Sequence, residues 1–284
     1  MSNENTSLMQ AVQNGKFNGY HLKLIALITM VIDHIAAVVL WRLYLASYDI
    51  HGGVYASEFL GDQLIVWVSQ NQELVYTIYE YMRIIGRMAF PIYCFLIVEG
   101  FLHTRSVGKY AFRLLAFAFI SEIPFDMAIA GSWLSWDYSN VFFTLCLGLV
   151  LIWGVSYVEK FYEFWQEKQW DVFLGKFIVL IAAGVMTVSV CAFAEIVLKT
   201  DYGYAGVLSI LVIYLFRRPK EVGFALSVFL LTILSSDIEL FAFLMLYPIS
   251  RYDGTRGKNM KYVFYAFYPV HLLMLALLCI LLGV

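Results

Sequence analysis

Residues 22–45 read LKLIALITMVIDHIAAVVLWRLYL, an apolar run interrupted near its centre by Asp33 and His34. About 20 apolar residues cross a bilayer core of roughly 30 Å, and the backbone groups there must be satisfied within the helix. The run therefore predicts a membrane-spanning helix that carries two ionisable residues. Because these residues interrupt it, the run is unlike the core of a cleaved signal peptide. We expect residues 1–21 to form a polar cytoplasmic tail before a retained first span.

The composition extends this prediction to the whole chain of 284 residues, of which 62% are hydrophobic and 14% charged. Soluble domains average about 45–50% apolar and about 25% charged residues, so a soluble enzyme is excluded. The net charge of -2 gives no support for nucleic-acid binding. All four cysteines lie in apolar runs without C-x-x-C spacing, which predicts buried thiols and no metal site.

Nine apolar runs predict an all-α fold, a polytopic bundle of about nine transmembrane helices in a single domain over residues 22–284. The seventh and eighth runs are short, and the sequence leaves open whether they cross fully. If both are re-entrant, the count falls to seven. The runs are 22–45, 75–102, 110–130, 141–158, 172–198, 202–216, 222–234, 238–249 and 262–282.

The distribution of Lys and Arg predicts the orientation of these runs. Fifteen of the 19 basic residues fall in the N-terminal tail and first turn or in every second loop after them. By the positive-inside rule, the N-terminus is expected in the cytoplasm and the C-terminus outside. Segment 46–74 then lies outside; it contains no Lys or Arg, and its stretch 64–68 predicts an interfacial helix.

Several ionisable residues fall inside the predicted spans, and depth distinguishes five of them. A charge in the hydrocarbon costs at least roughly 2.5–3.5 kcal/mol, so each is a candidate for function. At a rise of about 1.5 Å per residue from the cytoplasmic end, all five lie about 14–22 Å deep. A common depth in four helices predicts a shared catalytic pocket near the midplane, formed by Asp33, His34, Arg87, Glu122 and His271.

Several roles remain open for these residues. Arg87 is a counter-ion for Asp33 or Glu122, or a residue at the edge of the pocket. His34 is a base or a core histidine bonded to a carbonyl, and His271 is catalytic or stabilises a helix interrupted by Pro269. Neighbouring residues on a helix point about 100° apart, so Asp33 cannot orient His34. By depth, Glu122 is the best candidate for that role.

A histidine base, an orienting carboxylate and a cation suit acyl transfer to an amine or hydroxyl. They suit a proton-coupled transporter or exporter equally well, and a non-catalytic scaffold would use the same groups to hold helices together. The chemistry of the site alone does not separate these alternatives.

A second group of basic residues is predicted at the cytoplasmic face. The positive-inside rule already accounts for such residues. A more specific interpretation is a surface that binds the phosphates of a nucleotide-bearing donor, since Arg binds phosphate through two parallel hydrogen bonds. The candidates for donor binding are Lys23, His103, Arg105, Arg217, Arg218, Arg256 and Lys258.

Several short motifs follow one another along the chain: LKLIA (22–26) with Asp33 and His34, GRMAFP (86–91), EGFLHTR (99–105), SEIPF (121–125), NVFFTL (140–145), DYG (201–203), YDGTRG (252–257) and KYVFYAFYPVH (261–271). In this order they resemble the TraX family of bacterial integral-membrane acetylases, named for pilin N-acetylation. The resemblance covers nearly the whole chain. In a wider group of similar acyltransferases an arginine precedes the histidine of the first span by the spacing that separates Lys23 from His34. Lys23 keeps the positive charge of that arginine but lacks the guanidinium group, which can form two parallel hydrogen bonds to a phosphate.

The resemblance implies transfer of an acetyl group from acetyl-CoA to a pilin amino terminus, or to another peptide or a glycan acceptor presented at the membrane lipid. His34 would then take the proton from the acceptor, while the carboxylate of Glu122 or Asp33 balances the positive charges of the site. Arg87 or His271 would steady the oxyanion. A route through an acyl-cysteine at Cys94 or Cys146 is the alternative to direct transfer. The oligomeric state is left open.

Overall fold

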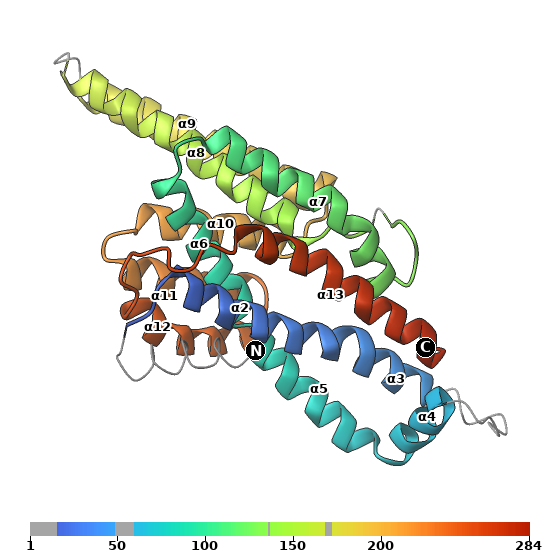
Figure 1. Cartoon of the computed structure of the whole chain (residues 1–284). Coiled ribbons are helices and arrows are strands. Elements are labelled where there is room, and N and C mark those ends of the chain that lie inside the picture. The colour runs from blue at the N-terminus through green and yellow to red at the C-terminus, as the bar shows by residue number, and fades with distance from the viewer. Residues whose placement is uncertain (1–15, 49–59, 136, 168–171) are drawn as a thin grey trace. The chain divides into compact units, whose positions relative to one another are not determined.

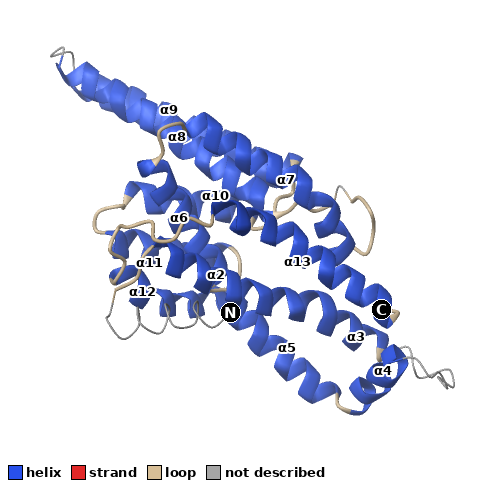
Figure 2. Cartoon of the chain, in the orientation of Figure 1, coloured by secondary structure: helices blue, strands red, loops and turns tan. Residues whose placement is uncertain are grey.

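A computed structural model describes residues 16–48, 60–135, 137–167 and 172–284 of the chain. Within these ranges the elements are helices, joined by turns and loops, and none is a strand (Figure 2). The predicted tail before residue 16, and residues 49–59 of the predicted outer segment, lie outside the described ranges. The all-helical class predicted from the sequence is therefore confirmed.

The chain divides into two compact units. Unit 1 comprises residues 1–92, 120–135 and 238–284, and unit 2 comprises residues 93–119 and 136–237. Two helices, α6 (Ala89–His103) and α7 (Val107–Ile129), contribute residues to both units. That residues 22–284 act as one acyltransferase-like domain stays a prediction.

Unit 1 is formed around its first helix. A continuous helix runs through α2 (Gly19–His34), the π-helix η1 (Ile35–Leu40) and α3 (Trp41–Ala46). The α2 part contacts α5 and α13, and η1 contacts them as well (Figure 1). The other elements of the unit are α4 (Leu60–Gln70), α5 (Gln72–Gly86), η4 (Asp237–Met245), α12 (Leu246–Ser250) and α13 (Lys261–Leu282).

Unit 2 contains the longest helix, α8 (Val141–Glu167), which contacts α9 (Val172–Ala192) and α10 (Gly203–Leu215). The π-helix η3 (Phe193–Val197) continues α9, and α11 (Lys220–Leu234) packs on α10. Most of α9 is exposed although it is strongly apolar, as expected of a helix that faces lipid.

Five of the described helices are long and apolar enough to cross a membrane: Gly19–Ala46, Gln72–His103, Val141–Gln166, Leu174–Val197 and Tyr262–Leu282. All nine predicted runs lie largely within helices, but nine crossings and the positions of the termini stay predictions. The run 238–249 is mostly a 3₁₀ helix, η4, followed by the short α12. The stretch predicted to be an interfacial helix lies within α4, and its depth stays a prediction.

A loop at the start of α2 holds that end of the helix. Asn18 caps α2, since its side chain accepts from the backbone N–H groups of Tyr20 and His21 at 3.1 Å. The N–H of Phe17 donates to the carbonyl of Arg251 at 3.0 Å, and that of Gly19 donates to the carbonyl of Thr255 at 2.8 Å. The loop 251–257 and α2 are thereby joined through backbone hydrogen bonds.

Gly86, the last residue of α5, allows this helix to approach α2 closely. A Cβ built at Gly86 would overlap with Cβ and Oδ1 of Asp33. The absence of a side chain at residue 86 therefore brings Arg83 and Arg87, on either side of it, within reach of Asp33.

We predict that Gly86→Ala destabilises the protein by about 1–3 kcal/mol, because the added methyl group overpacks the contact between α5 and α2. Thermal unfolding in detergent micelles measures the effect. Gly184→Ala is the matched control: among the described residues no heavy atom lies within 4 Å of a Cβ at Gly184, and alanine gains helix propensity there. Equal melting temperatures for the two variants would contradict the packing argument.

Candidate active site

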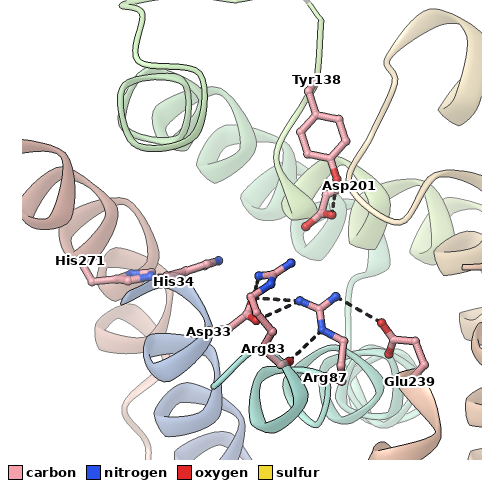
Figure 3. Close-up of polar contacts among 8 residues, drawn as sticks. All are labelled: Asp33, His34, Arg83, Arg87, Tyr138, Asp201, Glu239 and His271. Atoms are coloured by element: carbon pink, nitrogen blue, oxygen red, sulfur yellow. Dashed lines mark hydrogen bonds and ion pairs between the residues drawn. The ribbon is translucent and has the colours of Figure 1, made fainter. Parts of the chain in front are cut away.

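Asp33 and His34 are neighbours in the middle of α2 and turn to different partners. Residue 33 lies 14 residues after the start and 13 before the end of the span Gly19–Ala46. Asp33 pairs with arginines from α5 and the turn that follows it, whereas His34 pairs with a histidine of α13 (Figure 3). The helix continues as a π-helix directly after His34, a local widening that is frequent at functional sites.

Asp33 accepts hydrogen bonds from two guanidinium groups. Nη1 of Arg83 lies 2.7 Å from its Oδ2, and Nη2 of Arg87 lies 3.0 Å from Oδ1 and 3.1 Å from Oδ2. The Asp33 side chain is only 12% exposed. One buried carboxylate therefore holds two cations in the middle of a span.

Arg87 links Asp33 to a second carboxylate. Its Nη1 donates to Oε1 of Glu239 at 3.3 Å, and its Nε donates to the carbonyl of Arg83 at 3.2 Å. Glu239 lies in η4, and its side chain is fully buried. The four groups carry two negative and two positive charges, which balance as buried charges require.

His34 and His271 form the second polar pair of the site. Nδ1 of His34 lies 2.6 Å from Nε2 of His271, and Nδ1 of His271 lies 2.8 Å from the carbonyl oxygen of Phe267. The rings are nearly parallel, at 15°, with Tyr268 packed edge-on against both. His271 is 6% exposed and lies near the middle of α13.

The hydrogen-bond chain fixes which nitrogen of each neutral ring carries the proton. A carbonyl oxygen only accepts, so Nδ1 of His271 must donate to Phe267. Nε2 of neutral His271 then has a lone pair and accepts the proton of Nδ1 of His34. Nε2 of His34 is consequently left with a lone pair, on the side of the ring that points away from His271 (Figure 3).

The sequence assigned the orienting role beside His34 to Glu122, but in the structure His271 and the Phe267 carbonyl take it. Glu122 is buried in the part of α7 that belongs to unit 1. Depth alone could not separate Glu122 from His271, since both are mid-span. Arg87 is the predicted counter-ion of Asp33.

Two residues of the network were absent from the predicted site. Arg83 lies one helical turn before Arg87, a spacing that places both on one face of a helix and would have indicated the pair. Glu239 is the only acidic residue within the apolar run 238–249, which was a signal of the same kind as Asp33 and Glu122.

Three of the residues predicted to bind the donor gather at the start of α2 in unit 1. Nζ of Lys258 lies 5.9 Å from the centre of the Tyr20 ring, and Nζ of Lys23 lies 5.8 Å from that of Phe264. Arg256 donates to Asn259 at 2.6 Å and is exposed. We call Lys23, Arg256 and Lys258 the basic end of α2.

The other predicted donor-binding residues belong to unit 2. Arg217 stacks on Tyr214 with 4.4 Å from Cζ to the ring centre and pairs with Glu159 at 3.6 Å. His103 hydrogen-bonds the carbonyl of Glu99 at 2.8 Å. Arg105 and Arg218 lie in the turns that follow α6 and α10.

The DYG motif forms a tight turn in unit 2, ahead of α10. Tyr202 adopts φ 64° and Gly203 φ 44°, and the Asp201 carboxylate accepts a hydrogen bond from the Tyr138 hydroxyl at 2.6 Å (Figure 3). The Thr144 hydroxyl donates to the Asp201 carbonyl. These contacts join the turn to the start of α8, which is a structural role for the motif.

We predict that Asp33→Asn destabilises the protein by about 3–5 kcal/mol, because it leaves two buried guanidinium groups with too little negative charge. Asp237→Asn is the control, because the Asp237 side chain is exposed and should change stability by less than about 0.5 kcal/mol. Thermal unfolding in detergent measures both. A loss at Asp33 no larger than that at Asp237 would show that the ion pairs do not stabilise unit 1.

Comparison with known proteins places these residues in a family. A family model described as TraX protein matches residues 18–279. The chain is also 27% identical over 295 aligned residues to a protein of Dichelobacter nodosus named "Probable fimbrial assembly protein FimC, serogroup H1", with 94% of this chain and 96% of the relative covered. No solved structure matches significantly. With its apolar helices and a match over nearly its whole length, the chain is a multi-pass membrane protein that belongs to the TraX family.

Proposed function

We propose that this protein is a membrane-embedded acyltransferase that moves an acetyl or other short acyl group from acyl-CoA to an amine or hydroxyl acceptor. The observation that carries the proposal is the chain from the Phe267 carbonyl through His271 to His34. It leaves Nε2 of His34 as a base that is oriented by hydrogen bonds in the middle of a span. General-base catalysis requires a lone pair held in a fixed direction.

In the proposed reaction, Nε2 of His34 removes a proton from the acceptor amine or hydroxyl as that group attacks the thioester carbon. A C–N or C–O bond forms, and the electrons of the C=O bond move to its oxygen. The oxyanion then collapses, the C–S bond breaks, and the thiolate of CoA takes the proton from His34. The products are the acylated acceptor and CoA with a free thiol, and the base is regenerated.

The family and the relative support one class of acceptor. The Dichelobacter nodosus relative is named as a probable fimbrial assembly protein, and the TraX family is named for pilin N-acetylation. A fimbrial or pilin amino terminus at the bacterial inner membrane is therefore the acceptor we propose, and a peptide amine is the suitable probe.

The basic end of α2 is the proposed donor site. Lys23, Arg256 and Lys258 supply positive charge at the end of the same helix whose middle holds His34. From residue 23 to residue 34 the helix rises about 16 Å, at about 1.5 Å per residue. The pantetheine arm of CoA is an extended chain suited to spanning such a distance, which would separate nucleotide binding from chemistry.

We expect the purified protein to release the thiol of acetyl-CoA in the presence of a peptide amine, and His34→Gln to lower the rate by about 10²–10⁴-fold because it removes the base. Thiol release measured alongside mass spectrometry of the peptide tests this. His271→Gln, whose amide oxygen can still accept from His34, should retain more activity than His271→Phe.

Replacing Cys94 and Cys146 by alanine should leave transfer intact, because direct attack needs no acyl-cysteine. If wild-type protein in vesicles moves a peptide without consuming acetyl-CoA, the protein is a transporter and the proposed function is wrong.

Arg256→Gln should raise the KM for acetyl-CoA and leave kcat nearly unchanged, because Arg256 would bind phosphate remote from the reacting bond. The change should shrink when dephospho-CoA replaces CoA if Arg256 contacts the 3′-phosphate. Lys199→Gln is the control: Lys199 is an exposed residue of unit 2 that pairs with Asp137 at 3.8 Å. An unchanged KM in the Arg256 variant would remove this residue from the donor site.

A further inference from the structure

Arg83 and Arg87 share Asp33 but differ in how fully their donors are used. All three guanidinium nitrogens of Arg87 donate to protein oxygens: Nε to the Arg83 carbonyl, Nη1 to Glu239 and Nη2 to Asp33. Arg83 uses Nη1 alone, for Asp33. Among the described residues, none accepts a hydrogen bond from Nε or Nη2 of Arg83.

The exposure of the two side chains differs in the same sense. The Arg83 side chain is 27% exposed and that of Arg87 12%. Residue 83 lies 11 residues into the span Gln72–His103, which corresponds to about 16 Å at about 1.5 Å per residue. Lipid tails cannot accept hydrogen bonds, and an unsatisfied donor there costs several kcal/mol. The open donors of Arg83 therefore require water or a polar ligand.

In the view of Figure 3, the guanidinium group of Arg83 lies closer to the His34 ring than that of Arg87 does. Asp33 fixes the direction of the Arg83 guanidinium, and Asp33 and His34 are consecutive residues of one helix. The open donors and the lone pair of Nε2 of His34 thus belong to one polar region of unit 1.

We propose that Arg83 is the catalytic residue that binds the thioester carbonyl oxygen and stabilises the oxyanion, while Asp33, Arg87 and Glu239 are positioning residues that hold Arg83. This inference rests on the proposed acyltransferase function. It assigns to Arg83 the oxyanion role that the family resemblance implies for Arg87 or His271. Arg87 has no nitrogen left for a substrate, and His271 spends both ring nitrogens on Phe267 and His34.

The attack of the acceptor creates one positive charge, on His34, and one negative charge, on the carbonyl oxygen. When the acceptor attacks, the proton it loses makes His34 an imidazolium and the carbonyl oxygen becomes negative. Nε or Nη2 of Arg83 donates to that oxygen, and the ion-pair network, already neutral overall, needs no further counter-ion. When the C–S bond breaks, the oxygen returns to a neutral carbonyl and the CoA thiolate takes the proton from His34. Arg83 itself exchanges no proton.

The test compares Arg83→Gln and Arg83→Lys with the wild-type protein in detergent or nanodiscs, with acetyl-CoA and a peptide amine as substrates. Arg83→Gln should lower kcat by about 10²–10³-fold, as loss of one oxyanion donor does. The KM values of both substrates should change little. Arg83→Lys keeps the charge and the pairing with Asp33 but loses the fork, so its kcat should fall between the two.

Arg42→Gln is the matched control. Arg42 belongs to the same unit, and its Nη2 donates to the carbonyls of Met127 and Ala128 at 2.9 and 2.7 Å. This change should lower the melting temperature and leave kcat unchanged. Methylguanidinium added to Arg83→Ala should restore part of kcat and should not alter Arg42→Ala, an effect that a merely structural arginine would not show.

The outcomes separate the two proposals. If the wild-type protein transfers acyl groups and Arg83→Gln does so with the same kcat, Arg83 is not the oxyanion donor and the proposed function stands. If Arg83→Gln does not fold, the test rests on Arg83→Lys. If that variant folds and has the kcat of the wild-type protein, Arg83 is not the oxyanion donor. If the wild-type protein releases no thiol from acetyl-CoA, the proposed function fails, and the role of Arg83 fails with it.

Discussion

Two consecutive ionisable residues in the middle of an apolar helix are the constraint on which unit 1 depends. Asp33 and His34 cannot be satisfied by the same neighbour, because adjacent side chains point about 100° apart on a helix. One is satisfied by arginines of α5 and the turn after it, the other by a histidine of α13. The sequence of α2 thereby selects both of its packing partners, and Gly86 provides the space that the first contact needs.

The two polar pairs have different consequences for function. The ion-pair network is charge-balanced and mostly buried, so its charges hold one another in place. The histidine pair, in its neutral form, ends in a lone pair on Nε2 of His34. The proposed base thus lies beside charged groups whose positions are fixed before any reaction. Charges and dipoles that are fixed in advance supply most of the electrostatic stabilisation of transition states in enzymes.

Hydropathy predicted the helices well, because a long apolar run in a membrane can only be helical. It could not predict that η4 is a 3₁₀ helix or that Gln72–His103 breaks at Arg87 and Met88, since these depend on contacts with Asp33 and on local backbone geometry. Depth correctly grouped Asp33, His34, Arg87 and His271. It could not assign partners, because Glu122 and His271 have similar depth and only the direction of each side chain distinguishes them. Glu239 was missed because it lies in the short run 238–249, for which the sequence left open whether it crosses fully, so its depth could not be compared with that of the other residues.

The proposed role of His34 as a base depends on which of its ring nitrogens carries the proton. Nitrogen-15 NMR of the histidine side chains, with the protein in nanodiscs, observes this directly. With five histidines in the chain, spectra of His34→Gln and His271→Gln assign the two resonance pairs. We expect both rings to be neutral near pH 7, each with its proton on Nδ1. Nε2 of His34 should be unprotonated, and its resonance should shift when an acyl donor analogue binds. A spectrum in which Nε2 of His34 carries the proton, or in which His271→Phe, which cannot accept from His34, leaves the His34 tautomer unchanged, would contradict this assignment.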